Sequence, residues 1–262
     1  MRFVACIKQV PQSQESGIDS VTLSVRREGV PWMISPADEH ALEEALHLRE
    51  RFGGEVQALC MGVKSAVEML RYALSLGVDR VALVSDPMFV GSDTYVTARV
   101  LSRAIEKMGG ADVILCGRRS FDGETGQTAP QLAIHQNMIC VTNVIRVEAN
   151  LRGSLKITRL ADEGEELIEA EPPILLAVCE GINHVRLPGI GSMRRAKDVP
   201  VQVLNGEILG FRPDEVGIKG SPTRVVQVER VEFGRSVRVR IEKDARTGAE
   251  NILERVFRAS EG

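Results

Sequence analysis

The segment from Cys116 to Pro130 carries the strongest chemical signal in the sequence. It follows a short apolar run and contains three glycines, three hydroxyl side chains and one carboxamide. Glycine permits close approach of the backbone to a ligand, and free N–H groups at a helix start attract phosphate. Pro130 is tolerated only in the first turn of a helix, so we expect a helix to begin just before it. The segment therefore predicts a phosphate-binding loop, although a polar loop with an Asp-Gly turn would have the same composition.

Better-known nucleotide and metal motifs are absent from the sequence. There is no G-x-G-x-x-G segment, Walker loop or Ser-Gly-Gly-x-Asp-Ser loop, which argues against a standard dinucleotide fingerprint, a nucleoside triphosphatase and an ATP pyrophosphatase. The four histidines lack metal-ligand spacing, and His40 and His47 are interpreted as solvent-facing residues of a helix. The five cysteines form no C-x-x-C pair, so we expect neither zinc nor disulfides. Cysteines in apolar runs are interpreted as small buried hydrophobes in a reducing compartment, namely Cys6, Cys60, Cys116 and Cys179.

Composition and charge indicate an ordinary soluble protein of 262 residues, 44% hydrophobic and 26% charged, with a net charge of −3. The charge is uneven, because residues 186–262 carry 15 basic and 11 acidic side chains while the rest is acidic. This excess is too small, and aromatic residues are too few, for a nucleic-acid surface. No apolar run reaches the roughly 18 residues of a membrane span. Charge interrupts the N-terminus too soon for a signal peptide, so we expect a cytoplasmic protein.

The elements that must position the loop alternate through the first half of the chain. Short apolar runs predict strands buried on both faces at Phe3–Val10, Val56–Met61, Arg80–Val84 and Val113–Cys116. Helical patterns follow start signals at Ser35-Pro36, at Ser65 with Glu68 as a capping box, and at Ser92-Asp93. This alternation predicts an α/β protein with a doubly wound, mostly parallel, Rossmann-like sheet.

The pattern changes near residue 138. Residues 138–148, 154–160 and 165–170 alternate like antiparallel strands, and the apolar run Ile174–Cys179 returns to the core. From Pro188 onward apolar periodicity is sparse until a helix-like stretch at Ala249–Phe257. We therefore expect an α/β nucleotide-binding domain over residues 1–187. Residues 188–262 are expected to form a C-terminal recognition loop and an extended arm.

Several segments, in order along nearly the whole chain, carry a resemblance to one known family. The most specific is Asp122-Gly123-Glu124-Thr125-Gly126-Gln127-Thr128-Ala129-Pro130-Gln131, which resembles the nucleotide loop of electron-transfer flavoprotein β subunits. The other segments that carry the likeness are Lys8–Pro11, Glu28–Pro31, Ser35–Ala45, Ala73–Arg80, Asn183–Arg186 through Ala196–Lys197, and Gly220–Thr223.

The resemblance implies cofactors and partners. It implies a heterodimer with an α subunit that holds FAD and serves a flavin-dependent dehydrogenase. Conventional β subunits hold AMP, whereas electron-bifurcating ones hold a second FAD beside an NAD(H) site and also reduce ferredoxin or flavodoxin. Gly123, with Thr125 and Pro130, resembles the bifurcating type, because AMP-type members tend to carry acids in this segment. A missing side chain at Gly123 would leave room for a longer ligand.

Carried over position by position, the resemblance implies a cofactor site and a partner-recognition segment. The cofactor site would use Cys6, Ser35, Pro36, Ala37, Asp38, Met61, Gly117, Arg118, Arg119, Ser120, Phe121, Asp122, Gly123, Glu124, Thr125, Gly126, Gln127 and Thr128. Partner recognition would use Ile190, Met193, Arg194, Arg195 and Lys197.

The chain departs from the family pattern at several of these positions. Ser35 replaces an Asn, Ile190 replaces a Leu, His184-Val185 replaces Glu-Pro, and Asp198 interrupts a lysine run. We therefore expect a partner other than the common acyl-CoA dehydrogenase type. We find no acid–base pair or nucleophile in the sequence that would indicate a covalent mechanism. A nucleotide-binding regulatory protein of the same fold and a scaffold subunit without a redox ligand are the alternatives.

Overall fold

The structure, a computed structural model, describes residues 1–12, 31–150, 153–226 and 244–259. The chain divides into two units, Met1–Val226 and Gln227–Gly262. Residues 28–30 of the family-like segment Glu28–Pro31 lie outside the described residues.

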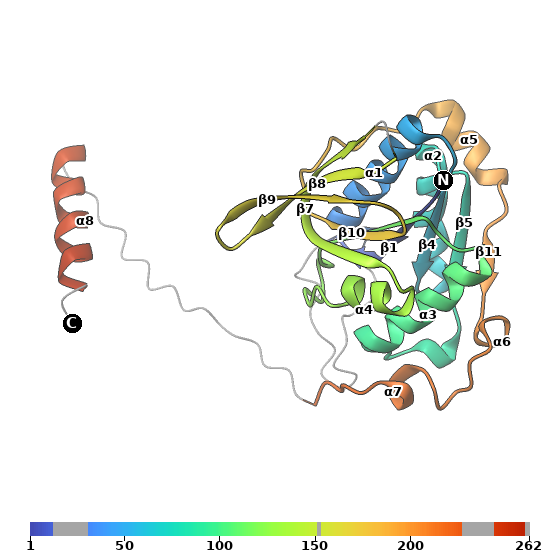
Figure 1. Cartoon of the computed structure of the whole chain (residues 1–262). Coiled ribbons are helices and arrows are strands. Elements are labelled where there is room, and N and C mark those ends of the chain that lie inside the picture. The colour runs from blue at the N-terminus through green and yellow to red at the C-terminus, as the bar shows by residue number, and fades with distance from the viewer. Residues whose placement is uncertain (13–30, 151–152, 227–243, 260–262) are drawn as a thin grey trace. The chain divides into compact units, whose positions relative to one another are not determined.

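A nine-stranded sheet forms the centre of the first unit (Figure 1). Its order is β11-β5-β4-β1-β6-β10-β7-β8-β9, in which β7, β8 and β9 are antiparallel neighbours and the other pairs are parallel. The strands are β1 (Arg2–Ile7), β4 (Glu55–Met61), β5 (Arg80–Val84), β6 (Val113–Gly117), β7 (Ile139–Ala149), β8 (Leu155–Ala161), β9 (Gly164–Ala170), β10 (Ile174–Val178) and β11 (Gln202–Leu204). The predicted parallel sheet, its antiparallel addition and the return into the core are confirmed.

Helices cover both faces of this sheet, and β1 shows why. Phe3, Ala5 and Ile7 pack into one apolar cluster, with α1 and α2, while Val4 and Cys6 pack into the other, with α3 and α4. Side chains of a strand point alternately to its two faces, so a strand between two helical layers must be apolar throughout. The helices of the first unit are α1 (Pro36–Phe52), α2 (Val67–Leu76), α3 (Thr94–Lys107), α4 (Thr128–His135), α5 (Ile190–Asp198), α6 (Gly206–Leu209) and α7 (Gly217–Gly220). The second unit contains α8 (Ala245–Ala259).

The expected first strand, Phe3–Val10, is interrupted at Lys8. Residues Gln9–Pro11 form a separate strand, β2, which pairs antiparallel with β3 (Trp32–Ile34) in a small second sheet. The chain therefore turns away from the main sheet after Ile7, and Lys8 lies at the carboxyl end of β1.

Two of the three predicted helix starts hold, and one is wrong. Asp93 caps α3 by accepting a hydrogen bond from the Val96 N–H at 3.0 Å, and α1 begins at Pro36 as expected. The capping box at Ser65 does not form. Residues Lys64–Ala66 make a 3₁₀ turn instead, and α2 begins at Val67 without a side-chain cap. The Ser65 hydroxyl faces the Gln9 side chain at 3.5 Å, so a contact with β2 replaces the local cap.

The segment after residue 187 is less arm-like than its sequence suggests. β11 extends the main sheet beside β5, and the Arg71 guanidinium donates to the Ala196 carbonyl, which fastens α5 near α2. Residues up to Val226 thus belong to the first compact unit, so contacts divide the chain at a different point from the expected boundary after residue 187. The predicted helix-like stretch forms α8, in the second unit.

Candidate functional site

The candidate site lies where the order of the sheet reverses. From β1 the chain moves outward to β4 and β5, then returns to the other side of β1 to form β6. Open α/β sheets bind ligands in the crevice beyond the carboxyl ends of the strands at such a switch point. In this sheet we expect that crevice beyond Ile7 and Gly117, the last residues of the two adjacent strands.

Asp38 joins the two sides of this crevice from the first turn of α1. Its carboxylate accepts the Gly117 N–H at 2.8 Å and the Lys8 N–H at 2.9 Å, and the residue is only 7% exposed. Burial raises the pKa of Asp38 to about 7, although both hydrogen bonds favour the ionised form. A side chain at Gly117 would contact Asp38 Oδ1 at 2.6 Å and Ala37 Cβ at 2.7 Å, so only glycine allows this approach.

The raised pKa of Asp38 should make the stability of the folded chain depend on pH. Because its pKa is raised from 3.8 to about 7, the folded state keeps a proton that the unfolded chain has released. The stabilising contribution is therefore complete below the unfolded pKa and declines as the pH rises toward the folded pKa, by at most about 1.4 kcal/mol per pH unit. Urea unfolding of wild type and Asp38→Asn at about pH 5 and about pH 8 should show wild type losing its relative advantage at the higher pH. A difference that stays constant or grows with pH would contradict this.

The loop after β6 is held against β1 by Lys8. The Lys8 ammonium contacts Asp122 Oδ1 at 2.5 Å and the Ser120 hydroxyl at 3.3 Å, and the Gly123 N–H donates to the same Asp122 oxygen at 2.7 Å. Burial alone would raise the pKa of Asp122, but the charge and hydrogen bond of Lys8 outweigh it and hold that pKa below its ordinary value. Asp122 is therefore an ionised carboxylate inside the candidate site.

The rest of the loop leads into α4 through two left-handed residues. Glu124 has a φ of 48° and Gly126 a φ of 64°. The Arg119 guanidinium lies 3.7 Å from the Glu124 carboxylate, and the Thr125 hydroxyl accepts the Gln127 N–H at 3.5 Å. α4 begins at Thr128 and contains Pro130 in its first turn, as expected.

The structure brings most of the expected cofactor-site residues to this crevice. The carboxyl end of β1, the first turn of α1 and the loop Gly117–Thr128 meet there. Ser35 is fully buried and its hydroxyl accepts the Phe121 N–H at 3.3 Å, so it holds the loop from within. Cys6 and Cys116 lie side by side on β1 and β6 with little exposure, and Met61 ends β4.

The expected partner-recognition residues lie on another element, α5. Ile190 and Met193 are 72% and 42% exposed there. The cationic side chains Arg194, Arg195 and Lys197 are also exposed. The helix thus presents an apolar and cationic surface, and no expected cofactor-site residue lies on it.

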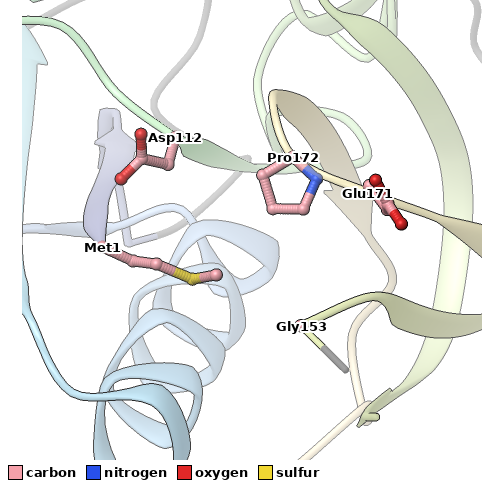
Figure 2. Close-up of a pocket in the computed structure, with 5 residues that line it drawn as sticks. All are labelled: Met1, Asp112, Gly153, Glu171 and Pro172. Atoms are coloured by element: carbon pink, nitrogen blue, oxygen red, sulfur yellow. The ribbon is translucent and has the colours of Figure 1, made fainter. Parts of the chain in front are cut away.

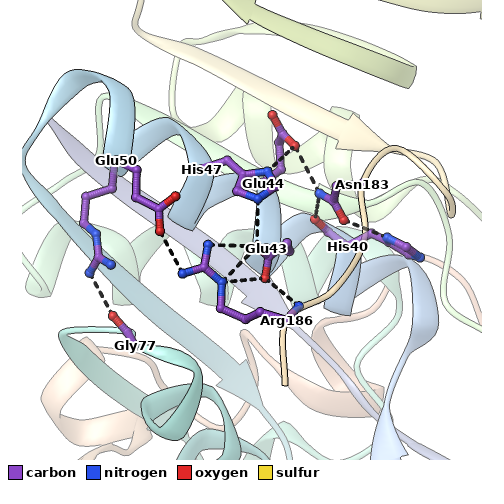
Figure 3. A network of polar contacts seen from close by, with 9 residues as sticks. His40, Glu43, Glu44, His47, Glu50, Gly77, Asn183 and Arg186 are labelled. Carbon is purple, nitrogen blue, oxygen red and sulfur yellow. Dashed lines mark hydrogen bonds and ion pairs between the residues drawn. The ribbon is translucent and has the colours of Figure 1, made fainter. Parts of the chain in front are cut away.

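A polar network that sequence analysis missed ties α1 to the loop before α5 (Figure 3). Glu43, with a side chain only 1% exposed, pairs with the Arg186 guanidinium at 2.8 Å and with the His47 ring at 2.9 Å. Arg186 also reaches Glu50 at 2.8 Å, which lowers the pKa of that carboxyl. The motif Asn183–Arg186 is therefore a structural anchor for the segment that leads to Ile190.

The interpretation of His40 and His47 as solvent-facing residues is wrong for His40 and incomplete for His47. His40 Nε2 accepts the Gly181 N–H at 3.2 Å, which assigns the proton to Nδ1, and Nδ1 lies 2.8 Å from the Asn183 side-chain oxygen. Asn183 donates in turn to Glu44 at 3.0 Å. His47 is 36% exposed but lies between two carboxylates. The partners of His40 are more than 130 residues away, and those of His47 are buried carboxylates on α1. Helical spacing alone therefore could not show the contacts of either histidine.

A cavity of about 400 Å³, drawn in Figure 2, lies at the amino ends of the strands, whereas the switch point lies beyond their carboxyl ends. Met1, Asp112, Gly153, Glu171 and Pro172 line it, and they lie near the amino ends of β1, β6 and β10. In the part of the chain that the structure describes, no cluster of His, Cys, Asp and Glu could hold a metal ion. The described helices include none long and apolar enough to cross a membrane.

The sheet order, with its reversal at β1, and the helices on both faces define a doubly wound α/β protein. Residues 22–207 match the family described as the electron transfer flavoprotein domain, so the chain belongs to the electron transfer flavoprotein family. Its relatives place it among the β subunits and FixA proteins of that family, and a β subunit implies an α subunit as its partner.

Three relatives show the extent of the likeness. The chain is 38% identical to the electron transfer flavoprotein subunit beta of Thermoanaerobacterium thermosaccharolyticum, over 98% of each chain. It is 37% identical to the caffeyl-CoA reductase-Etf complex subunit CarD of Acetobacterium woodii, over 86% of each chain. It is 37% identical to protein FixA of Sinorhizobium fredii, over 87% of this chain and 82% of the relative.

Proposed function

We propose that this β subunit binds FAD at the switch point, with NAD(H) beside it, and takes part in flavin-based electron bifurcation. One observation carries the proposal: Lys8 and the loop Gly117–Thr128 meet at the switch point. The Asp38 carboxylate accepts the N–H groups of Lys8 and Gly117, and the Lys8 ammonium contacts the loop. A cation, backbone N–H groups and a helix start are the features that bind a nucleotide diphosphate.

The residues present fit such a ligand. A Cβ at Gly123 would point toward the Ser120 hydroxyl at 3.5 Å and the Lys8 ammonium at 4.0 Å, so glycine keeps space beside the cation. Arg118 adds a positive charge to the same loop, whereas the charge of Arg119 is paired with Glu124. These residues would bind and orient the nucleotide, and the flavin would supply the redox chemistry when bound.

A hydride from NADH delivers two electrons. One would pass to the FAD of the α subunit and on to a flavin-dependent dehydrogenase, and the other to ferredoxin or flavodoxin. A conventional carrier with AMP in this crevice is the alternative, because the same donors suit its phosphate.

The identity of the bound nucleotide tests this proposal. Heating the complex purified with its α subunit and separating the released nucleotides should yield FAD in excess of the amount that the α subunit holds. AMP would support the conventional alternative, and the absence of any adenine nucleotide from the β subunit would contradict both.

We propose that α5 carries the contact with the dehydrogenase. Truncation of an apolar anchor at the centre of an interface often costs about 2 kcal/mol. Ile190→Ala, which removes a 72% exposed side chain, should slow electron delivery to the dehydrogenase and spare NADH oxidation by an artificial acceptor. Leu167→Ala, at a 68% exposed position on β9, is the control and should change neither rate. Equal losses in both assays for Ile190→Ala would show that it acts in packing.

We further propose that the protein is cytoplasmic. We also propose that residues 188–262 wrap the α subunit. Beyond α5, exposed apolar side chains recur along the described part of this segment, at Val203, Ile208, Ile218, Val225 and Val226. Limited proteolysis should cut the segment faster in the isolated chain than in the heterodimer. Equal protection in both samples would contradict the proposal.

A further inference from the structure

The ion pair of Lys8 and Asp122 spans the switch point inside the proposed nucleotide site. Lys8 follows β1, and Asp122 belongs to the loop after β6, 114 residues further along the chain. The carboxylate accepts from the Lys8 ammonium, from the Gly123 N–H and from the Ser120 hydroxyl. One ammonium, one backbone N–H and one hydroxyl around a single oxyanion are a donor set that proteins use for phosphate.

We propose that Lys8 is the cation that binds the nucleotide phosphate, and that the Asp122 carboxylate competes with the phosphate for it. The inference rests on the proposed function and adds to it a residue that sequence analysis left out of the site. It treats Asp122 as an internal anion of the loop, which the ligand displaces, and not as a ligand contact.

Charge makes the competition necessary. Two anions that share one ammonium repel each other, and the repulsion is strong at short range in a partly desolvated crevice. Lys8 is 45% exposed and Asp122 is 19% exposed, so a ligand can reach the ammonium from solvent while the carboxylate moves outward.

The loop can release Asp122 without losing its anchor. The Gly117 N–H is bound to Asp38, and the Arg118 N–H donates to the Val178 carbonyl at 2.7 Å. These bonds fix the start of the loop on the sheet. Asp122 itself is followed by Gly123, whose backbone is not in the left-handed region and meets nothing closer than 3.5 Å at its Cβ position.

The test compares AMP with adenosine as probes, because they differ only in the phosphate. The full chain in complex with its α subunit is depleted of nucleotide by dialysis, and both ligands are titrated by calorimetry. Asp122→Asn should bind AMP about tenfold more tightly than wild type, equivalent to ~1.4 kcal/mol, with adenosine affinity unchanged. Lys8→Gln should weaken AMP binding at least about tenfold and bring it close to that of adenosine.

Glu163→Gln, an exposed residue in the turn between β8 and β9, removes the same charge at another place and should change neither affinity. Unchanged or weaker AMP binding by Asp122→Asn would overturn the inference and make the carboxylate a loop-shaping group. Wild type that binds AMP as weakly as adenosine would also overturn it, while leaving the proposed function standing. If wild type binds neither probe, FAD nor any other adenine nucleotide, the proposed function fails, and the inference fails with it.

Discussion

Gly123→Asp is expected to abolish FAD retention by the β subunit. A Cβ at this position would lie 4.0 Å from the Lys8 ammonium, so a carboxylate there would stand beside Asp122 and face the diphosphate. Two unit charges about 4 Å apart repel by roughly 4 kcal/mol at an effective dielectric of 20. A third of that energy is enough to weaken binding about tenfold.

Gly123→Ala is the matched control for this substitution. The nearest atom to the new methyl group would be the Ser120 hydroxyl at 3.5 Å, an ordinary contact, and the backbone at 123 is not left-handed. The alanine variant should therefore keep its nucleotide. Flavin content and NADH-dependent ferredoxin reduction of the purified heterodimers measure both effects. Full flavin content and activity in the aspartate variant would show that charge and size at 123 do not control the ligand.

Arg186→Met should lower the free energy of unfolding by about 3 kcal/mol, because it leaves the Glu43 carboxylate buried without its main partner. Glu43 has a side chain that is 1% exposed, and Arg186 donates to it from its guanidinium and from its backbone N–H. We expect the lower part of the range for broken buried pairs, because the Arg186 side chain is itself 30% exposed.

Arg103→Met provides the comparison. Arg103 and its partner Glu106 are 59% and 49% exposed on α3, and such surface pairs contribute about 1 kcal/mol or less. Urea unfolding of both variants at neutral pH gives the two changes. If Arg186→Met costs no more than Arg103→Met, the network around Glu43 does not hold the loop before α5 in place.

The sheet could be predicted from sequence because its signals are local. Buried strands such as Val113–Gly117 are apolar throughout, and Asp93 caps α3 through a residue three positions away. Ser65 has the same local signal as Asp93, yet its hydroxyl contacts Gln9 and the helix begins later. A long-range contact overrides a capping preference, which is worth only about 1 kcal/mol.

The polar part of the site could be predicted only in outline. The composition of the loop Gly117–Thr128 predicts a phosphate-binding site. The pairs Lys8–Asp122 and Glu43–Arg186 join residues more than 100 positions apart, so no local pattern predicts them. Long-range contacts also explain why residues 188–226 belong to the first unit. Asp93 accepts a hydrogen bond from the Thr223 hydroxyl at 2.7 Å and thus fastens a segment with little apolar periodicity to the start of α3.

The number of flavins in each heterodimer tests the central claim most directly. The complex of this chain with its α subunit can be purified, its protein quantified, and its FAD released and measured by absorbance. The account predicts two FAD molecules per heterodimer, of which the Gly123→Asp variant retains one. One FAD together with one AMP in the wild-type complex would contradict it and would make this chain a conventional carrier subunit.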